Sequence, residues 1–169
     1  MIRTTAFCLC LSLLCAPAVQ ADITMHFVEG APKDRFVLTN TGTCPIKEAT
    51  ITLDVGAAPA GLLFDTDPGG AGLEVSQPFE VIEGRNALLG LPELADGDTV
   101  LTLNMGGLPA GSTVSFSLDL DDSGTGRRTV VSGSEIAGSV VTLVFGATTL
   151  HATFTDQASA IIPVAPCTS

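Results

Sequence analysis

The chain has 169 residues, of which 18 are acidic and seven are basic, and its formal net charge is −11. A protein this acidic repels the phosphate backbone of nucleic acids and anionic membranes, which argues against both as partners. The same charge favours cations and cationic partners.

The start of the chain has the composition of a signal peptide. Arg3 precedes an apolar run over residues 6–15, and small residues stand at positions −3 and −1 of a cleavage site after Ala21. We therefore expect residues 1–21 to be removed on export. The remaining residues, 22–169, have the length of one domain, which we expect to be secreted or periplasmic.

A lipid anchor and a membrane span are the alternatives to a cleaved signal peptide. Lipidation of Cys15 would need a small residue before it, and Leu14 stands there. The apolar run is also shorter than the roughly 20 residues that cross a bilayer, and no later run reaches that length. We therefore predict no transmembrane segment in residues 22–169.

Alternation of apolar and polar residues dominates the rest of the chain and predicts strands with one buried face. Between the alternating segments lie clusters of Gly, Pro, Asp and Asn, which favour tight turns. No segment combines helical periodicity with capping residues, so no long helix is expected. In chain order, the predicted strands span residues 23–28, 35–40, 50–55, 79–82, 99–105, 112–121, 128–132, 140–145, 150–155 and 160–164.

Nine or ten short strands in one domain indicate an all-β fold. The predicted architecture is a single antiparallel β-sandwich, and a closed barrel is the alternative. Alternation is clearest over residues 112–121, where Val114 and Phe116 share the face that we expect in the core. Ser115 and Ser117 share the opposite face, which we expect to be solvated.

Two cysteines lie beyond the predicted signal peptide, Cys44 and Cys167. An exported protein folds in an oxidising compartment, so we predict one disulfide between them. Such a bridge stabilises the fold by about 4 to 5 kcal/mol in the chain-entropy estimate. A metal site or a reactive thiol is the alternative use of these residues.

Residues for catalysis are poorly represented. The sequence has no Gly-x-Ser-x-Gly motif, and His26 and His151 fall on the outward faces of strands that are far apart in the chain. A carboxylate pair could hydrolyse glycosides, but the chain has no Trp or Tyr on which a sugar ring could stack. We therefore predict that the protein is not an enzyme and has no catalytic residues.

Aspartates gather at the end of the predicted strand 112–121. Asp119 and Asp121 share one face of that strand, and Asp122 follows as the chain enters a Gly-rich turn. Calcium takes six to eight oxygen ligands, and carboxylates at a strand end can supply several. A predicted hairpin after Asp122 would bring Glu135 back to the same place. The candidate calcium ligands are therefore Asp119, Asp121, Asp122 and Glu135, and the alternative is that these carboxylates are only hydrated.

Two further acidic pairs are secondary candidates for calcium. Asp65 and Asp67 precede a Pro-Gly-Gly turn, and Asp96 and Asp98 flank a glycine. Asp is also a preferred turn residue because its side chain accepts hydrogen bonds from the nearby backbone, so a turn role is the alternative for both pairs.

Parts of the chain also carry a resemblance to a known family. The residues that carry it are 27–36, 38–42, Cys44, 116–122, 131–138 and 167–169. They resemble small exported bacterial proteins known as aggregation factor core. The Phe-Ser-Leu-Asp-Leu-Asp-Asp segment and the Gly-Ser-Glu-Ile-Ala-Gly segment after it are also similar to a β-sandwich module of large secreted adhesin-type proteins. The resemblance implies adhesion at or outside the cell surface, with calcium as a candidate aid.

The sequence therefore predicts a secreted, non-enzymatic β-sandwich that acts in adhesion, aggregation or surface recognition. The expected partner is an unidentified protein or glycan at the cell surface, and calcium is the one candidate cofactor. The alternative function is that of a structural accessory protein of the periplasm or envelope with no specific ligand.

Overall fold

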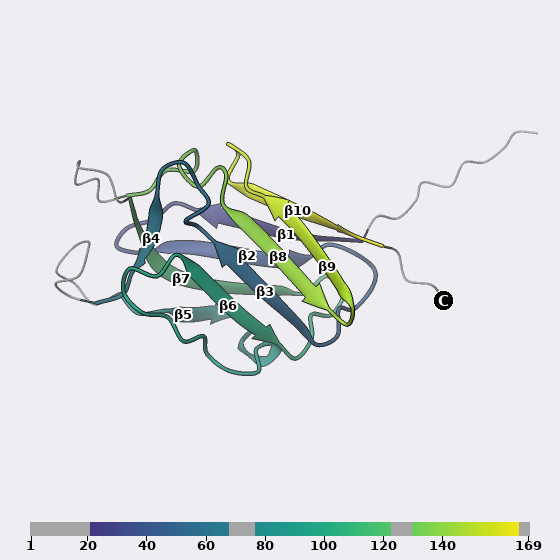
Figure 1. Ribbon diagram of the computed structural model, residues 1–169. Helices are drawn as coiled ribbons and strands as arrows, with labels where there is room; N and C mark the ends of the chain where they lie inside the picture. The colour runs from purple at the N-terminus through teal and green to yellow at the C-terminus, as the bar shows by residue number, and fades with distance from the viewer. Residues whose placement is uncertain (1–20, 68–76, 123–129, 166–169) are drawn as a thin grey trace, which may run out of the picture.

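The computed structural model describes residues 21–67, 77–122 and 130–165 (Figure 1). Within these residues the chain forms ten strands and one short 3-10 helix, η1, at Arg85–Ala87. The strands are β1 (Ala21–Val28), β2 (Asp34–Asn40), β3 (Ala49–Asp54), β4 (Leu62–Asp65), β5 (Glu80–Glu83), β6 (Val100–Met105), β7 (Thr113–Asp122), β8 (Val140–Phe145), β9 (Thr148–Thr153) and β10 (Ser159–Val164).

The strands form two antiparallel sheets that face each other (Figure 1). The first sheet has the order β10-β1-β2-β7, and the far edge of β7 is shared by β5 and β4. The second sheet has the order β6-β3-β8-β9. The prediction of an all-β fold is confirmed, and nine of the ten predicted segments overlap an observed strand.

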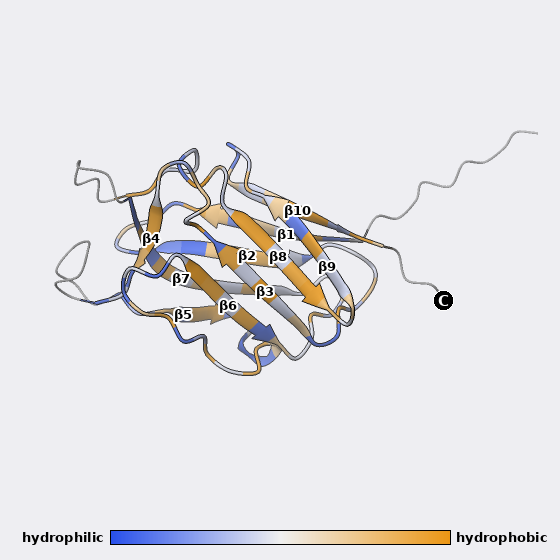
Figure 2. Ribbon diagram, viewed as in Figure 1, coloured by the Kyte–Doolittle hydropathy of each residue, from blue (hydrophilic) through white to orange (hydrophobic). Residues whose placement is uncertain are grey.

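The core is built from the alternating apolar residues on the facing sides of the two sheets, and hydrophobic residues recur along the strands of both (Figure 2). Phe36 of β2 and Phe116 of β7 are fully buried, and their stacked rings have centroids 5.3 Å apart. From the second sheet, Leu101 and Leu103 of β6 are also buried. Burial of these side chains is the main favourable contribution to folding.

The prediction that the polar face of β7 is solvated is wrong. Ser115, Ser117, Asp119 and Asp121 are all less than 10% exposed, and so is every residue of β7 from Val114 to Asp121. Strands pair with β7 on both edges, and the side chain of Gln77 contacts Asp119. Alternation shows which residues share a face, but a central strand can be covered on both faces.

Two predicted segments need correction. β4 was not predicted, because four residues are too few to show an alternating pattern. The predicted strand over 128–132 begins outside the described residues, and its described part is not a strand. The backbone N–H of Glu135 donates to the Ser132 carbonyl at 2.9 Å, so the chain turns there instead of extending.

Within the described part of the chain, no helix is long and apolar enough to cross a membrane.

Candidate functional site

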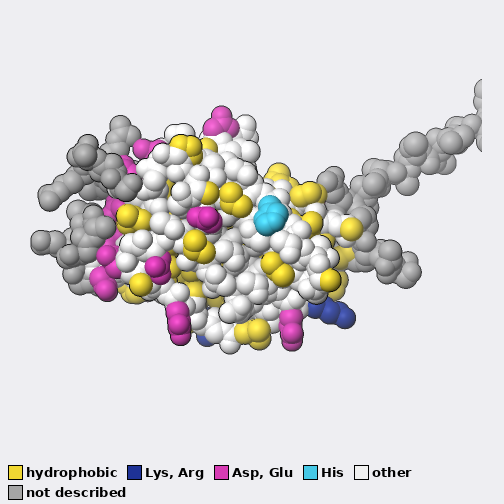
Figure 3. All heavy atoms as spheres, viewed as in Figure 1, with side chains coloured by type: hydrophobic (Ala, Val, Ile, Leu, Met, Phe, Trp, Pro, Cys, Tyr) yellow, Lys and Arg dark blue, Asp and Glu magenta, His cyan; other side chains and the backbone are white. Residues whose placement is uncertain are grey.

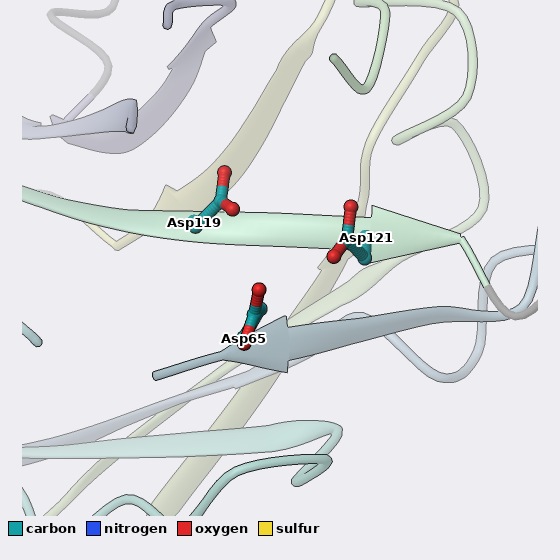
Figure 4. A group of neighbouring side chains, drawn as sticks. All are labelled: Asp65, Asp119 and Asp121. Carbon is teal, nitrogen blue, oxygen red and sulfur yellow. The ribbon is translucent and has the colours of Figure 1, made fainter. Parts of the chain in front are cut away.

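Three aspartates from two neighbouring strands lie together in a buried group (Figure 4). Asp119 and Asp121 belong to β7, and Asp65 is the last residue of β4. One carboxylate oxygen from each residue lies within 4.8 Å of the other two. Asp65, Asp119 and Asp121 are 0%, 6% and 9% exposed. We call these three residues the aspartate cluster.

The strand register explains how the aspartate cluster forms. β4 and β7 are antiparallel, and Asp65 stands directly opposite Asp119. Asp121 joins them because residues two apart in a strand share a face. The sequence placed Asp119 and Asp121 together but left Asp65 as a separate candidate, since β4 was not predicted. An apolar run that ends in Asp before a Pro-Gly-Gly turn is the sequence signal that could have predicted β4 and so placed Asp65 with the other two.

The other two predicted calcium ligands lie outside the aspartate cluster. Asp122 follows Asp121 in β7, so strand alternation directs its side chain away from the face of the cluster. The Glu135 carboxylate accepts hydrogen bonds from the Ser132 backbone N–H at 2.8 Å and from the Ser132 hydroxyl at 2.7 Å. Glu135 therefore closes a turn in the segment that follows β7.

The secondary aspartate pair around Gly97 has turn roles in the structure. Asp96 Oδ1 accepts hydrogen bonds from the backbone N–H groups of Thr66 at 3.0 Å and Asp67 at 3.4 Å. Asp98 Oδ2 accepts one from the Ala95 N–H at 2.8 Å. These bonds fasten the end of β4 to the chain that leads into β6.

Gln77 extends the aspartate cluster with an uncharged group. It is 2% exposed, and its Nε2 donates a hydrogen bond to Asp119 Oδ2 at 2.7 Å. Its backbone N–H donates to the Thr66 carbonyl at 3.3 Å, which keeps it beside the end of β4. The side-chain oxygen of Gln77 is buried and has no hydrogen-bond partner in residues 21–67, 77–122 and 130–165. No sequence pattern indicated this residue.

Burial and mutual repulsion both disfavour ionisation in the cluster. Burial raises the pKa of the Asp119 carboxyl to about 7, and the Asp121 charge adds to this effect. The charges of Asp34 and Asp65 act in the same direction. Burial also raises the pKa of Asp121, and the charge of Asp122 is the next largest cause of the increase. Ionised carboxylates are therefore costly in this crowded and poorly hydrated environment unless a positive charge compensates them.

The basic side chains that the structure describes do not balance the charge of the two β7 residues. Among the described residues the one salt bridge joins Lys33 and Glu80, and no described Lys or Arg forms an ion pair with Asp119 or Asp121. One carboxylate oxygen of Asp121 is also buried, with no hydrogen-bond partner in the part of the chain that the structure describes. Buried carboxylates are normally paired, protonated or bound to a metal ion.

The two histidines lie on exposed strand faces, as predicted. His26 is on β1 in the first sheet, and His151 is on β9 in the second. His151 Nδ1 forms a hydrogen bond with the Thr142 hydroxyl across the β8-β9 pair at 2.9 Å. Neither histidine belongs to a metal-binding group of the described residues.

The outer face of the second sheet carries little charge. Figure 3 shows this face in front, mostly uncharged, with acidic side chains gathered toward the end of the molecule where β4 lies. The strand register aligns its outward residues in rows, of which the middle one has three threonines and a histidine. We call this surface the threonine face, and its residues are Thr50, Thr52, Asp54, Val100, Thr102, Asn104, Val140, Thr142, Val144, Thr149, His151 and Thr153.

Comparison with known proteins gives no match to this chain among family models, curated proteins or solved structures. The geometry described above is therefore the basis for a functional proposal.

Proposed function

We propose that this chain is an exported, non-enzymatic β-sandwich domain that recognises a protein at the cell surface and acts in adhesion or aggregation. The observation that carries the proposal is the threonine face, an almost uncharged sheet surface on a protein with a net charge of −11. Asp54 is its one acidic residue, and it has no Lys or Arg.

Electrostatics favour the threonine face as the contact surface. A strongly acidic protein is repelled by the anionic groups that are common on cell surfaces, and the repulsion is weakest where its own charge is lowest. Depletion of charged residues is also typical of the centres of protein interfaces. The threonine face can therefore approach a partner at a low electrostatic cost.

The side chains of this face fit a protein partner better than a glycan. Threonine hydroxyls can donate and accept hydrogen bonds, and strand pairing holds them in fixed positions, which lowers the entropy lost on binding. Val100 and Val144 add apolar contact area, being 44% and 37% exposed. The chain has no Trp or Tyr that would stack on a sugar ring.

A binding assay on whole cells tests this proposal. The exported protein is labelled and added to cells of the organism that produces it. The variants His151→Glu and His26→Glu provide a matched comparison, because both histidines are exposed but lie on different sheets. We expect His151→Glu to abolish binding and His26→Glu to leave it unchanged. Protease treatment of the cells should also abolish binding. Equal binding of both variants would overturn the proposal, and binding that survives protease but not periodate would point to a glycan instead.

Export and the predicted disulfide belong to the same proposal. β1 begins at Ala21, so cleavage after this residue would leave all but one residue of the strand. The Thr41 N–H donates to the Asp22 carbonyl at 2.9 Å, and Asp22 pairs with Pro163 of β10. The chain that leads to buried Cys44 thus lies beside Pro163 of β10, four residues before Cys167, which is outside the described residues. This arrangement supports a Cys44–Cys167 bridge.

A further inference from the structure

We propose that the aspartate cluster, together with Gln77, binds one calcium ion. The three carboxylates come from Asp65, Asp119 and Asp121, and the side-chain oxygen of Gln77 is the uncharged ligand. This site lies on the first sheet, away from the threonine face, so it stands independently of the proposed recognition function.

The spacing of the carboxylates fits a calcium ion. Calcium binds oxygen ligands at about 2.3 to 2.6 Å, so two ligands of one ion lie up to roughly 5 Å apart. The three carboxylate oxygens lie within 4.8 Å of one another, which lets them contact the same ion. Magnesium requires oxygens at about 2.0 to 2.1 Å and retains several waters, so a buried protein cluster suits it less well.

Gln77 provides the independent indication of a ligand. Its amide is 2% exposed, and its oxygen is buried beside the cluster without a hydrogen-bond partner among the described residues. Buried polar atoms in native proteins nearly always have a partner, so this oxygen needs an explanation. Amide oxygens are ordinary calcium ligands. Rotation of the amide about its terminal bond would place the oxygen beside Asp119, where the nitrogen now donates to the carboxylate.

The charges of the cluster point to a cation as well. Asp119 and Asp121 are buried neighbours on one strand face, and no described basic residue forms an ion pair with either. Within the described part of the chain, an oxygen of Asp121 is also buried without a hydrogen-bond partner. A divalent cation would neutralise two charges, use the lone pairs of Asp121 and Gln77, and fasten β4 to β7.

The test measures calcium binding and thermal unfolding of the full exported protein. After EDTA treatment and dialysis, calorimetric titration with CaCl₂ should show one ion bound per chain, and the melting midpoint should rise with calcium concentration because the ion binds only the folded state. Titration with MgCl₂ should give a smaller shift. A wild-type protein that binds no calcium, or that binds magnesium instead, would overturn the proposal.

Two variants provide a matched pair for the same experiment. Asp121→Asn should weaken calcium binding by at least about 10-fold, because loss of even a residue that only supports a ligand typically costs about 10- to 100-fold in metal affinity. Asp122→Asn, one residue further along β7 and outside the cluster, should weaken binding much less, because it removes a nearby charge but no ligand. Asp121→Asn also removes a buried charge, so without calcium its midpoint should equal or exceed that of the wild type. Equal calcium affinity in the two variants would contradict the assigned ligands.

Discussion

At the scale of single residues, the most informative buried group is the Asp34 carboxyl at the start of β2. It is 1% exposed, and Oδ1 accepts a hydrogen bond from the Gly30 N–H at 3.0 Å. Burial nevertheless raises the pKa of Asp34 from 3.8 to about 7, and the charges of Glu29 and Asp121 add to the increase. At a pH between these two values, the folded protein therefore holds a proton on Asp34 that the unfolded chain has already released.

This difference predicts how stability depends on pH when calcium is absent. Between pH 3.8 and about 7 the unfolded chain binds fewer protons at this site than the folded protein, so the free energy of unfolding should fall as pH rises. Asp34→Asn should reduce this dependence and leave the part that is due to Asp119, whose pKa is also raised to about 7, whereas exposed Asp156→Asn should not change it. Urea unfolding at several pH values in EDTA provides the measurement. Stability that rises with pH over this range would contradict the prediction.

Gly84 is a second residue whose role can be tested alone. Its φ is +75°, and a Cβ placed there would lie 2.4 Å from the Thr113 carbonyl oxygen. Gly97 has a similar φ of +80° but open space around it. Gly97→Ala should therefore destabilise by about 1 to 2 kcal/mol from backbone strain alone. Gly84→Ala should cost about 1 to 3 kcal/mol more, because packing is also disturbed. Equal losses in urea unfolding would show that the predicted clash is relieved.

At the scale of elements, β7 shows which structural features its sequence could predict and which it could not. Alternation predicted that Phe116 is buried, because the apolar residues of this strand share one face. It could not show that Ser115 and Asp119 are also buried, since that depends on strands distant in the chain. For the same reason, the sequence placed Asp119 and Asp121 together but did not place Asp65 with them. The aspartate cluster requires the pairing of β4 with β7, whose paired residues Asp65 and Asp119 are 54 positions apart.

Phe116 tests the packing of β7 directly. Its ring is fully buried, with the Phe36 centroid 5.3 Å away and the Phe79 centroid 5.2 Å away. Phe116→Ala should lower the free energy of unfolding by about 3 to 5 kcal/mol, through lost burial and the cavity that remains. Phe79→Ala should cost less, because Phe79 is only partly buried. A loss below about 1 kcal/mol for Phe116→Ala would contradict the assigned core face.

At the scale of the whole molecule, the last strand of the described chain pairs with the first. β10 pairs with β1, and β1 pairs with β2, so the three strands form a continuous part of the first sheet. Asn40, the last residue of β2, donates hydrogen bonds from Nδ2 to the carbonyls of Cys44 at 2.7 Å and Leu108 at 2.9 Å. The chain around Cys44 is thereby fixed at the end of the sheet where β10 also ends.

The proposed Cys44–Cys167 disulfide would join the segment that follows β2 covalently to the segment that follows β10. It would close a loop of roughly 120 residues, for which the chain-entropy estimate gives about 4 to 5 kcal/mol of stabilisation. We expect no titratable thiol in the exported protein after denaturation without reductant, and two after reduction. The double variant Cys44→Ser and Cys167→Ser should unfold at a lower urea concentration than the oxidised wild type, and at a similar one to the reduced wild type. Two free thiols in the unreduced exported protein would show that these cysteines are not paired.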